Sequence, residues 1–214
     1  MLREQRPALF ILLGGFAAVL GWSAVHPHDY FTWGLEVFPA LLALAALAAT
    51  YRRFQFTTFV YVLILFHACI LFVGGHYTYA EVPLFNWIRD HFHLGRNHYD
   101  RVGHFAQGFV PALVAREVLL RRKIVLRRGW LFFIVLSICL AVSAAYELLE
   151  WRVSVATGSA ADAFLGTQGD PWDTQEDMAT AAIGALTALL FFSRWHDRLI
   201  GRMEEKQTAA RTAG

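Results

Sequence analysis

Residues 129–150, GWLFFIVLSICLAVSAAYELLE, contain no charged residue before Glu147. A helix that crosses the hydrocarbon core of a bilayer needs about 20 mainly apolar residues. Because the bilayer offers no water to backbone polar groups, such a segment has to satisfy its own hydrogen bonds as a helix. This stretch therefore predicts a transmembrane helix rather than an element of a soluble core.

The rest of the chain repeats this pattern. Its 214 residues are 57% hydrophobic and 17% charged, whereas soluble domains are about 45–50% apolar and about 25% charged. We expect an all-α, polytopic membrane helix bundle of about six transmembrane helices, forming a single domain over residues 1–198. The spans are expected at residues 7–25, 30–51, 54–75, 102–120, 129–150 and 177–195. The first is longer than the apolar region of a signal peptide, about 7–15 residues, so we interpret it as a retained helix.

Two segments outside the spans have their own patterns. In residues 81–94, the apolar side chains Leu84, Phe85, Ile88 and Phe92 fall on one helical face. That pattern predicts a short helix lying in the membrane interface. Residues 199–214 are polar and are expected to form a disordered cytoplasmic tail.

The charges are divided between the two sides of the predicted bundle. If the N-terminus lies inside, 15 of the 19 Lys and Arg residues fall on the inner side, which predicts that both termini are cytoplasmic. Twelve of the 17 acidic residues and seven of the nine histidines fall on the outer side. Acidic residues contribute little to topology, so the acidic outer face requires another explanation. The basic residues follow one side of the membrane rather than a groove, and we expect no nucleic-acid partner.

Asp100 and His104 stand four residues apart at the outer end of the fourth span. Positions i and i+4 share a helical face. A carboxylate and an imidazole there are suited to a divalent metal or to general acid–base chemistry. The alternative is structural: Asp100 caps the helix, and His104 hydrogen-bonds a neighbouring helix.

Glu147 and Glu150 lie near the outer, C-terminal end of the fifth span, where the helix dipole disfavours anions. They need a metal ion, another cation, an arginine partner among Arg96, Arg101 and Arg152, or a raised pKa that keeps them neutral. The alternative is that they form a structural ion pair.

The third polar segment is GDPWDTQED, residues 169–177. Asp173 and Glu176 resemble a variant of the capping box, with Asp173 as the N-cap. Asp173 and Asp177 nevertheless share one helical stripe, and capping does not explain Asp170. His67, in the middle of the third span, is expected to hydrogen-bond another helix.

Together these stripes predict an acidic, histidine-containing cavity on the outer face, because ionisable residues within a membrane are functional candidates. The predicted catalytic residues are His104, Glu147, Glu150 and Asp100. The predicted ligands of a divalent metal ion are His104, Glu147, Glu150, Asp173 and Asp177. The predicted substrate contacts are His76, Arg96, Arg101, Asp170 and Trp172.

Three motifs carry a resemblance: GGHYTYAEVPLFNWIRDHFHLGRNHYDRVGHFAQGF (74–109), YELLEW (146–151) and GTQGDPWDTQEDMATAAIGA (166–185). With them, nearly the whole chain resembles the YjdF family of bacterial inner-membrane proteins. The resemblance implies a multi-pass protein of the bacterial inner membrane and no particular activity.

A partial similarity to VanZ-like proteins covers residues 100–184. Those proteins carry an Asp/His pair that opens one helix, a later Glu, and an Asp at the entry to the last helix. The matching positions here are Asp100 and His104, Glu147 or Glu150, and Asp173 or Asp177. VanZ-like proteins are associated with glycopeptide resistance and the cell envelope, and this similarity is an analogy.

Three functions are compatible with these features. The first is a metal-assisted hydrolase or transferase that acts on a lipid or cell-envelope substrate. The second is a proton- or cation-coupled transporter of small molecules. The third is a non-catalytic envelope scaffold or sensor whose acids form structural ion pairs. In each case membrane lipids are the expected partners, and the sequence leaves the oligomeric state open.

Overall fold

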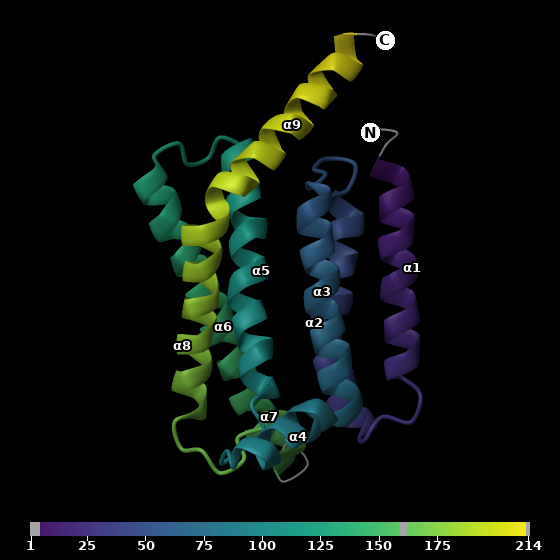
Figure 1. The fold of residues 1–214 in the computed structure, drawn as a ribbon, viewed down its shortest axis with the longest axis vertical. Helices are drawn as coiled ribbons and strands as arrows, with labels where there is room; N and C mark the ends of the chain where they lie inside the picture. Colours follow the sequence, from purple (N-terminus) through teal and green to yellow (C-terminus); the bar gives the residue numbers. More distant parts are fainter. Residues whose placement is uncertain (1–4, 159–161, 213–214) are drawn as a thin grey trace.

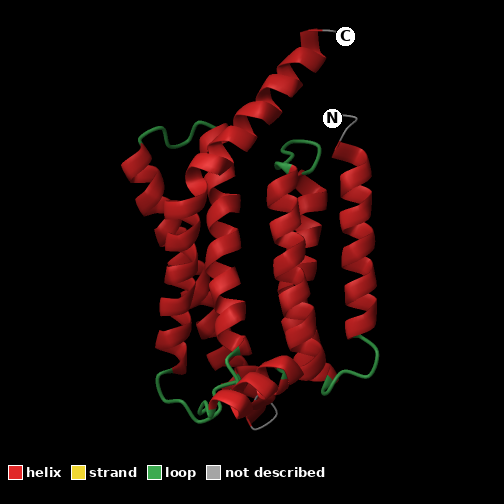
Figure 2. Cartoon of the chain, viewed as in Figure 1, coloured by secondary structure: helices red, strands yellow, loops and turns green. Residues whose placement is uncertain are grey.

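The computed structural model describes residues 5–158 and 162–212, and this part of the chain forms helices joined by loops, with no strand (Figure 2). The prediction of an all-α bundle is confirmed. Both termini lie at one end of the molecule, which we call the termini end (Figure 1). We call the opposite end, where α4 lies, the α4 end.

Most of the chain lies in long helices that run side by side between these two ends (Figure 1). They are α1 (Gln5–Ser23), α2 (Tyr30–Thr50), α3 (Thr58–Tyr77), α5 (Tyr99–Arg121), α6 (Arg128–Thr157) and α8 (Asp173–Thr187). α8 continues through a π-helical turn, Ala188–Phe192, into α9 (Ser193–Thr212). The short helices α4 (Pro83–Phe92) and α7 (Asp162–Leu165) lie across the α4 end.

Four helices are long and apolar enough to cross a membrane: Tyr30–Thr50, Thr58–Tyr77, Arg128–Thr157 and Asp173–Ala209. A shorter apolar helix covers Pro7–Ser23. α5 runs beside them, but buried polar residues such as Asp100, His104, Arg116 and Glu117 reduce its apolar character. The expectation of six spans with those boundaries stays a prediction.

The prediction that the segment after Arg198 is disordered is wrong, because α9 extends to Thr212. Ile200 and Met203 stand three residues apart and are both buried. Polar composition suggested a free tail, whereas apolar side chains at helical spacing give this segment a face that packs.

α5 and α8 approach each other closely. A Cβ atom at Gly108 would lie 1.8 Å from the carbonyl oxygen of Ala181, and one at Gly184 would lie 2.1 Å from that of Phe105. No larger side chain fits at either glycine, so the two backbones are in direct contact. This contact brings the α4-end turns of α5 and α8, which carry the polar stripes, against each other.

Candidate functional site

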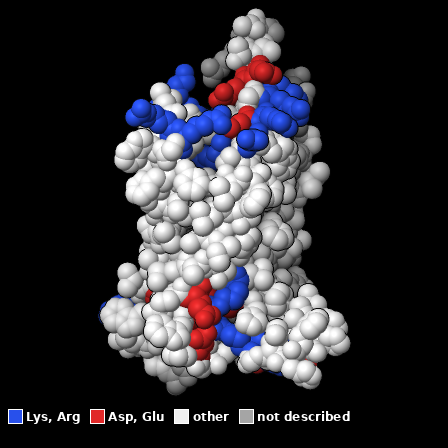
Figure 3. Space-filling view, turned by 60° about the vertical axis from the view of Figure 1, so that its left-hand side comes forward, with Lys and Arg blue, Asp and Glu red and all other residues white. Residues whose placement is uncertain are grey.

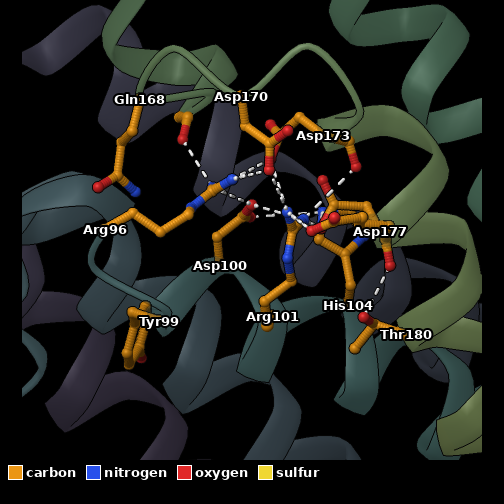
Figure 4. A network of polar contacts seen from close by, with 12 residues as sticks. Arg96, Tyr99, Asp100, Arg101, His104, Gln168, Asp170, Asp173, Asp177 and Thr180 are labelled. Carbon is orange, nitrogen blue, oxygen red and sulfur yellow. Dashed lines mark hydrogen bonds and ion pairs between the residues drawn. The ribbon is translucent and has the colours of Figure 1, made fainter. Parts of the chain in front are cut away.

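A cluster of charged side chains lies at the α4 end, and Figure 3 shows basic and acidic groups side by side there. We call it the α4-end cluster. Its members are Arg96, Asp100, Arg101, His104, Glu147, Asp170, Asp173, Glu176 and Asp177. They come from α5, α6, α8 and the loops before α5 and α8, and most of them are drawn in Figure 4. Three separate sequence stripes therefore meet at one place.

Both arginines of the cluster form ion pairs with carboxylates of the protein. Arg96 Nη1 lies 2.6 Å from Asp173 Oδ1 and 3.1 Å from Asp170 Oδ2. Arg101 Nη2 lies 3.0 Å from Asp173 Oδ1, and its Nη1 donates to Asp177. Arg96 and Arg101 were predicted to contact substrate, but in this arrangement both guanidinium groups neutralise acids of the protein itself.

The capping prediction for Asp173 is wrong. α8 begins at Asp173, its N-cap residue is Trp172, and no side chain caps it. Asp173 points instead toward the arginines, because a buried carboxylate needs a cationic partner. Asp170 Oδ1 accepts a hydrogen bond of 2.9 Å from the backbone N–H of Trp172. That hydrogen bond, followed by Arg96 and Arg101, holds the pKa of Asp170 below its usual value.

The capping alternative for Asp100 is also wrong. α5 begins at Tyr99 with His98 at the N-cap position, and Asn97 Oδ1 accepts a hydrogen bond of 3.0 Å from the backbone N–H of Tyr99. The Asp100 side chain, freed from capping, lies 3.5 Å from Arg96 Nη2 and 3.4 Å from His104 Nε2.

His104 lies at the centre of the cluster. Its Nδ1 is 3.0 Å from Gln107 Oε1, and because that oxygen only accepts, Nδ1 carries the proton. Its Nε2 faces Asp100 Oδ1 at 3.4 Å and Asp177 Oδ1 at 3.7 Å. The predicted bond from His104 to a neighbouring helix is absent from the described residues, since Gln107 is on the same helix. In a neutral imidazole of this tautomer, the Nε2 lone pair would face two carboxylate oxygens, whereas a protonated imidazole, or a metal ion bound at Nε2, would pair with them.

The cluster contains more buried acid than buried base. Among the described atoms of the cluster, Asp100 Oδ2, Glu147 Oε1 and Arg96 Nε are buried without a hydrogen-bond partner, and Asp100 Oδ2 lies 3.5 Å from Arg96 Nη2. The ligand atoms offered by Asp100, His104 and Asp177 all lie within 4.8 Å of one another, and the three residues are buried. Unpaired buried charge is costly, so the cluster requires protons or a further cation.

A cavity of about 150 Å³ adjoins His104 and Asp100. Glu150 lines it, and so do Glu36 of α2 and Tyr146 of α6. Sequence reasoning missed Glu36, although a single acid in an apolar span usually faces the interior of a bundle. His67 also lines this cavity, and within the described part of the chain it forms none of the predicted hydrogen bonds to another helix.

Some predicted residues lie elsewhere or have other partners. His76 Nδ1 is 3.1 Å from the carbonyl oxygen of Ser23, and its ring packs against Trp22. Trp172 is 64% exposed. In the described residues neither Glu147 nor Glu150 pairs with an arginine, and Arg152 lies over the ring of Trp151. Glu147 Oε1 instead lies 3.8 Å from His104 Nδ1, an ion pair when the imidazole is protonated, so the ion-pair alternative remains open for Glu147. Within the described residues Glu150 has no ion-pair partner.

A second buried polar network lies at the termini end, and we call it the termini-end network. Its members are Thr57, Arg116, Glu117, Arg121, His196 and Asp197. Glu117 is fully buried and accepts from the backbone N–H of Thr57 at 2.8 Å, Arg121 Nη1 at 2.9 Å and His196 Nε2 at 3.0 Å. Sequence reasoning had assigned this end no site, and its acids and bases are balanced.

Apolar spanning helices, basic residues gathered at the termini end (Figure 3) and a buried polar cavity define a multi-helix membrane protein. A family model described as "Predicted membrane protein (DUF2238)" matches residues 8–198, and the chain belongs to this family. The chain is 49% identical to the protein named "Inner membrane protein YjdF" of Escherichia coli (strain K12) over 184 residues. That match covers 86% of this chain and 88% of the relative.

The resemblance to the YjdF family is thus confirmed. The weaker similarity to VanZ-like proteins stays a prediction, because neither match bears on it. No solved structure matches the chain significantly.

Proposed function

We propose that this chain holds a divalent metal ion in the α4-end cluster and uses it to hydrolyse or transfer a group on a lipid or cell-envelope substrate. The observation that carries the proposal is the arrangement at His104: Nδ1 donates to Gln107, and Nε2 faces the carboxylates of Asp100 and Asp177. Histidines that bind metals donate their other ring N–H in this way.

The spacing of these groups fits a metal ion. Ligand atoms about 2.1 Å from a tetrahedral zinc ion lie about 3.4 Å apart, and the two distances from Nε2 are 3.4 and 3.7 Å. Arg101 competes for Asp177, but its Nη2 also reaches Glu176 at 2.8 Å. Arg101 therefore keeps an acidic partner when Asp177 turns toward the ion.

The surroundings supply what a metal-assisted hydrolase or transferase needs. A bound divalent ion lowers the pKa of its water and generates a nucleophile at neutral pH. Glu147 Oε1 lies 3.8 Å from His104 Nδ1 and is without a hydrogen bond in the described structure, which suits a proton acceptor. Glu150 and Asp100 line the adjoining cavity.

The proposed substrate reaches this end from the membrane. α4 lies across it and exposes Leu84, Trp87 and Phe92, a surface suited to the lipid interface. We place the basic termini end in the cytoplasm of a bacterial inner membrane, following the excess of Lys and Arg there. The cavity then lies near the outer leaflet.

The first test is the metal content of untagged protein in mild detergent after incubation with Zn²⁺, Mn²⁺ or Mg²⁺. We expect about one divalent ion per chain. At 100 times the dissociation constant, the ion adds about 2.7 kcal/mol to the free energy of unfolding. His104→Ala and Asp177→Asn lose the ion, whereas Asp90→Asn, at an exposed acid of the same end paired with Arg89, keeps it.

The second test addresses the chemistry. Protein in nanodiscs made from a total bacterial lipid extract is incubated with and without the ion, and products are identified by mass spectrometry. A product that requires the ion and His104 supports the proposal. An absence of bound metal in wild-type protein, with His104→Ala and Asp177→Asn still folded, overturns it.

Cation- or proton-coupled transport is the second candidate. It is favoured because the cavity extends from His104 to His67, which lies near the middle of α3 (Thr58–Tyr77). Flux of a cation or proton in proteoliposomes that is abolished by His67→Ala would support this function over the enzymatic one.

A further inference from the structure

Two buried glutamates, Glu36 and Glu150, also line the cavity next to His104. They come from α2 and α6, and they are only 4% and 9% exposed. Within residues 5–158 and 162–212, neither carboxylate forms an ion pair, and Arg96 and Arg101 are held by other acids. Two carboxylates buried to more than nine-tenths thus face a cavity whose described lining has no Lys or Arg, and whose His104 already lies against Asp100 and Asp177.

The lining around Glu36 and Glu150 is aromatic and apolar. Tyr79 and Tyr146 stand beside Glu36, and Leu71, Val142 and Phe164 complete the wall. The faces of tyrosine rings attract organic cations, and carboxylates pair with them. At about 30 Å³ for each water of the liquid, the cavity of about 150 Å³ has room for about five such molecules, more than one bare ion needs.

We infer that Glu36 and Glu150 form a subsite for a primary ammonium group on a short alkyl chain. The inference deepens the proposed function, on which it rests, by naming the substrate class: an amphiphile that carries an amine. An anionic group is disfavoured, because the described lining offers it no free cation. The apolar wall receives the carbon chain, and Val142 is 42% exposed on the outer surface of α6, at the edge of the cavity.

Two sources share this chemistry: the amine of a lipid headgroup and a free alkylamine. The probe is butylammonium, and 1-butanol, with the same number of non-hydrogen atoms, is the uncharged control. The thermal midpoint of the full chain is measured in amine-free buffer, in nanodiscs of phosphatidylglycerol, at constant ionic strength kept by KCl.

We expect butylammonium to raise the midpoint saturably, while 1-butanol and additional K⁺ leave it unchanged. Glu36→Gln and Glu150→Gln, which keep size and remove charge, weaken the apparent affinity by about tenfold or more. Asp177→Asn loses the divalent ion but still responds to butylammonium, so failure of the metal site and failure of the ammonium subsite are distinguishable.

A titration in nanodiscs that contain phosphatidylethanolamine distinguishes a lipid headgroup amine from a free alkylamine as the natural ligand. If the lipid amine occupies the subsite, more butylammonium is needed there for the same shift; an unchanged titration assigns the site to free amines. The inference is overturned if wild-type protein does not respond to butylammonium, or responds equally to K⁺ or 1-butanol. It is also overturned if folded Glu36→Gln and Glu150→Gln respond as wild type does.

Discussion

His196 and His104 lie at opposite ends of the bundle, and each faces a buried carboxylate. His196 Nε2 donates to Glu117, while its Nδ1 accepts from Arg116 Nη1 at 3.4 Å. His104 Nδ1 also has a partner, but its Nε2 faces two carboxylate oxygens. Both nitrogens of His196 thus have one hydrogen-bond partner each, whereas His104 Nε2 is shared between two carboxylates at the longer distances of an ion pair, 3.4 and 3.7 Å.

This difference separates a structural network from a candidate site. A buried ion network holds a fold together when every charge is compensated. At the termini end only Arg121 Nε is without a hydrogen bond in the described residues, and it lies 3.8 Å from Glu204 Oε1. In the α4-end cluster the described atoms without a hydrogen bond are Arg96 Nε and two carboxylate oxygens, Asp100 Oδ2 and Glu147 Oε1, and Asp100 also lines the cavity. A bound cation would compensate the carboxylates of the α4-end cluster.

The largest expected effect tests the structural network. Glu117→Ala leaves Arg121 and His196 without their buried anion, and it should lower the free energy of unfolding by about 3–5 kcal/mol. The measurement is unfolding in mixed detergent micelles, and divalent ions should not restore the loss. Glu204→Ala, at an exposed acid of the same end, should cost no more than about 1 kcal/mol. Equal stability of Glu117→Ala and wild type would contradict the structural assignment.

The next effect tests the incomplete cluster. Arg101→Gln removes a cation that Asp173 and Asp177 share, so without metal the variant should lose about 3 kcal/mol of stability. Because Asp177 is then free, a divalent ion should stabilise this variant more than it stabilises wild type. Unfolding is followed with and without the ion, and Arg121→Gln at the termini end serves as the matched control. A metal response that is no larger than in wild type would argue against competition between Arg101 and the ion.

The smallest effect concerns Asp170 in the loop before α8. Its pKa is lowered in the folded protein, so its contribution to stability is fully present above its ordinary pKa near 3.8 and disappears as the pH falls through the lower, folded value. Asp170→Asn should therefore be less stable than wild type at pH 6, and the difference should shrink toward pH 3. A difference that stays constant over this range would mean that the Asp170 charge contributes nothing.

The sequence predicted the helices better than it predicted the contacts between them. Long apolar runs, interrupted in α2 only by Glu36, identify α2, α3 and α6, because each run must satisfy its own backbone in a bilayer. The spacing of Asp100 and His104 correctly placed them on one helical face. The prediction that Asp173 and Asp177 share one face of a helix was likewise correct, since both contact Arg101.

The features that the sequence did not predict, namely the partners of Asp100 and Asp173 and the packing of α5 against α8, depend on contacts between segments far apart in the chain. Asp173 and Asp100 were given a capping alternative because local spacing cannot show that Arg96 and Arg101 approach them. The pairing of α5 with α8 depends on Gly108 and Gly184, whose role is visible only when both backbones are in place. Glu36 offered a readable signal, since a lone acid in an apolar span points inward.

Glu36 also has a consequence for the order of synthesis. Tyr146 and Glu150 follow it by about 110 residues. At about 5–20 residues per second, roughly 5–20 s pass between the emergence of α2 and that of these neighbours. During that interval α2 has to enter the bilayer with a carboxyl that the finished bundle encloses. Glu36 lies about two helical turns from the start of α2. Its carboxyl can therefore stay near the lipid headgroups until α6 has been synthesised and inserted.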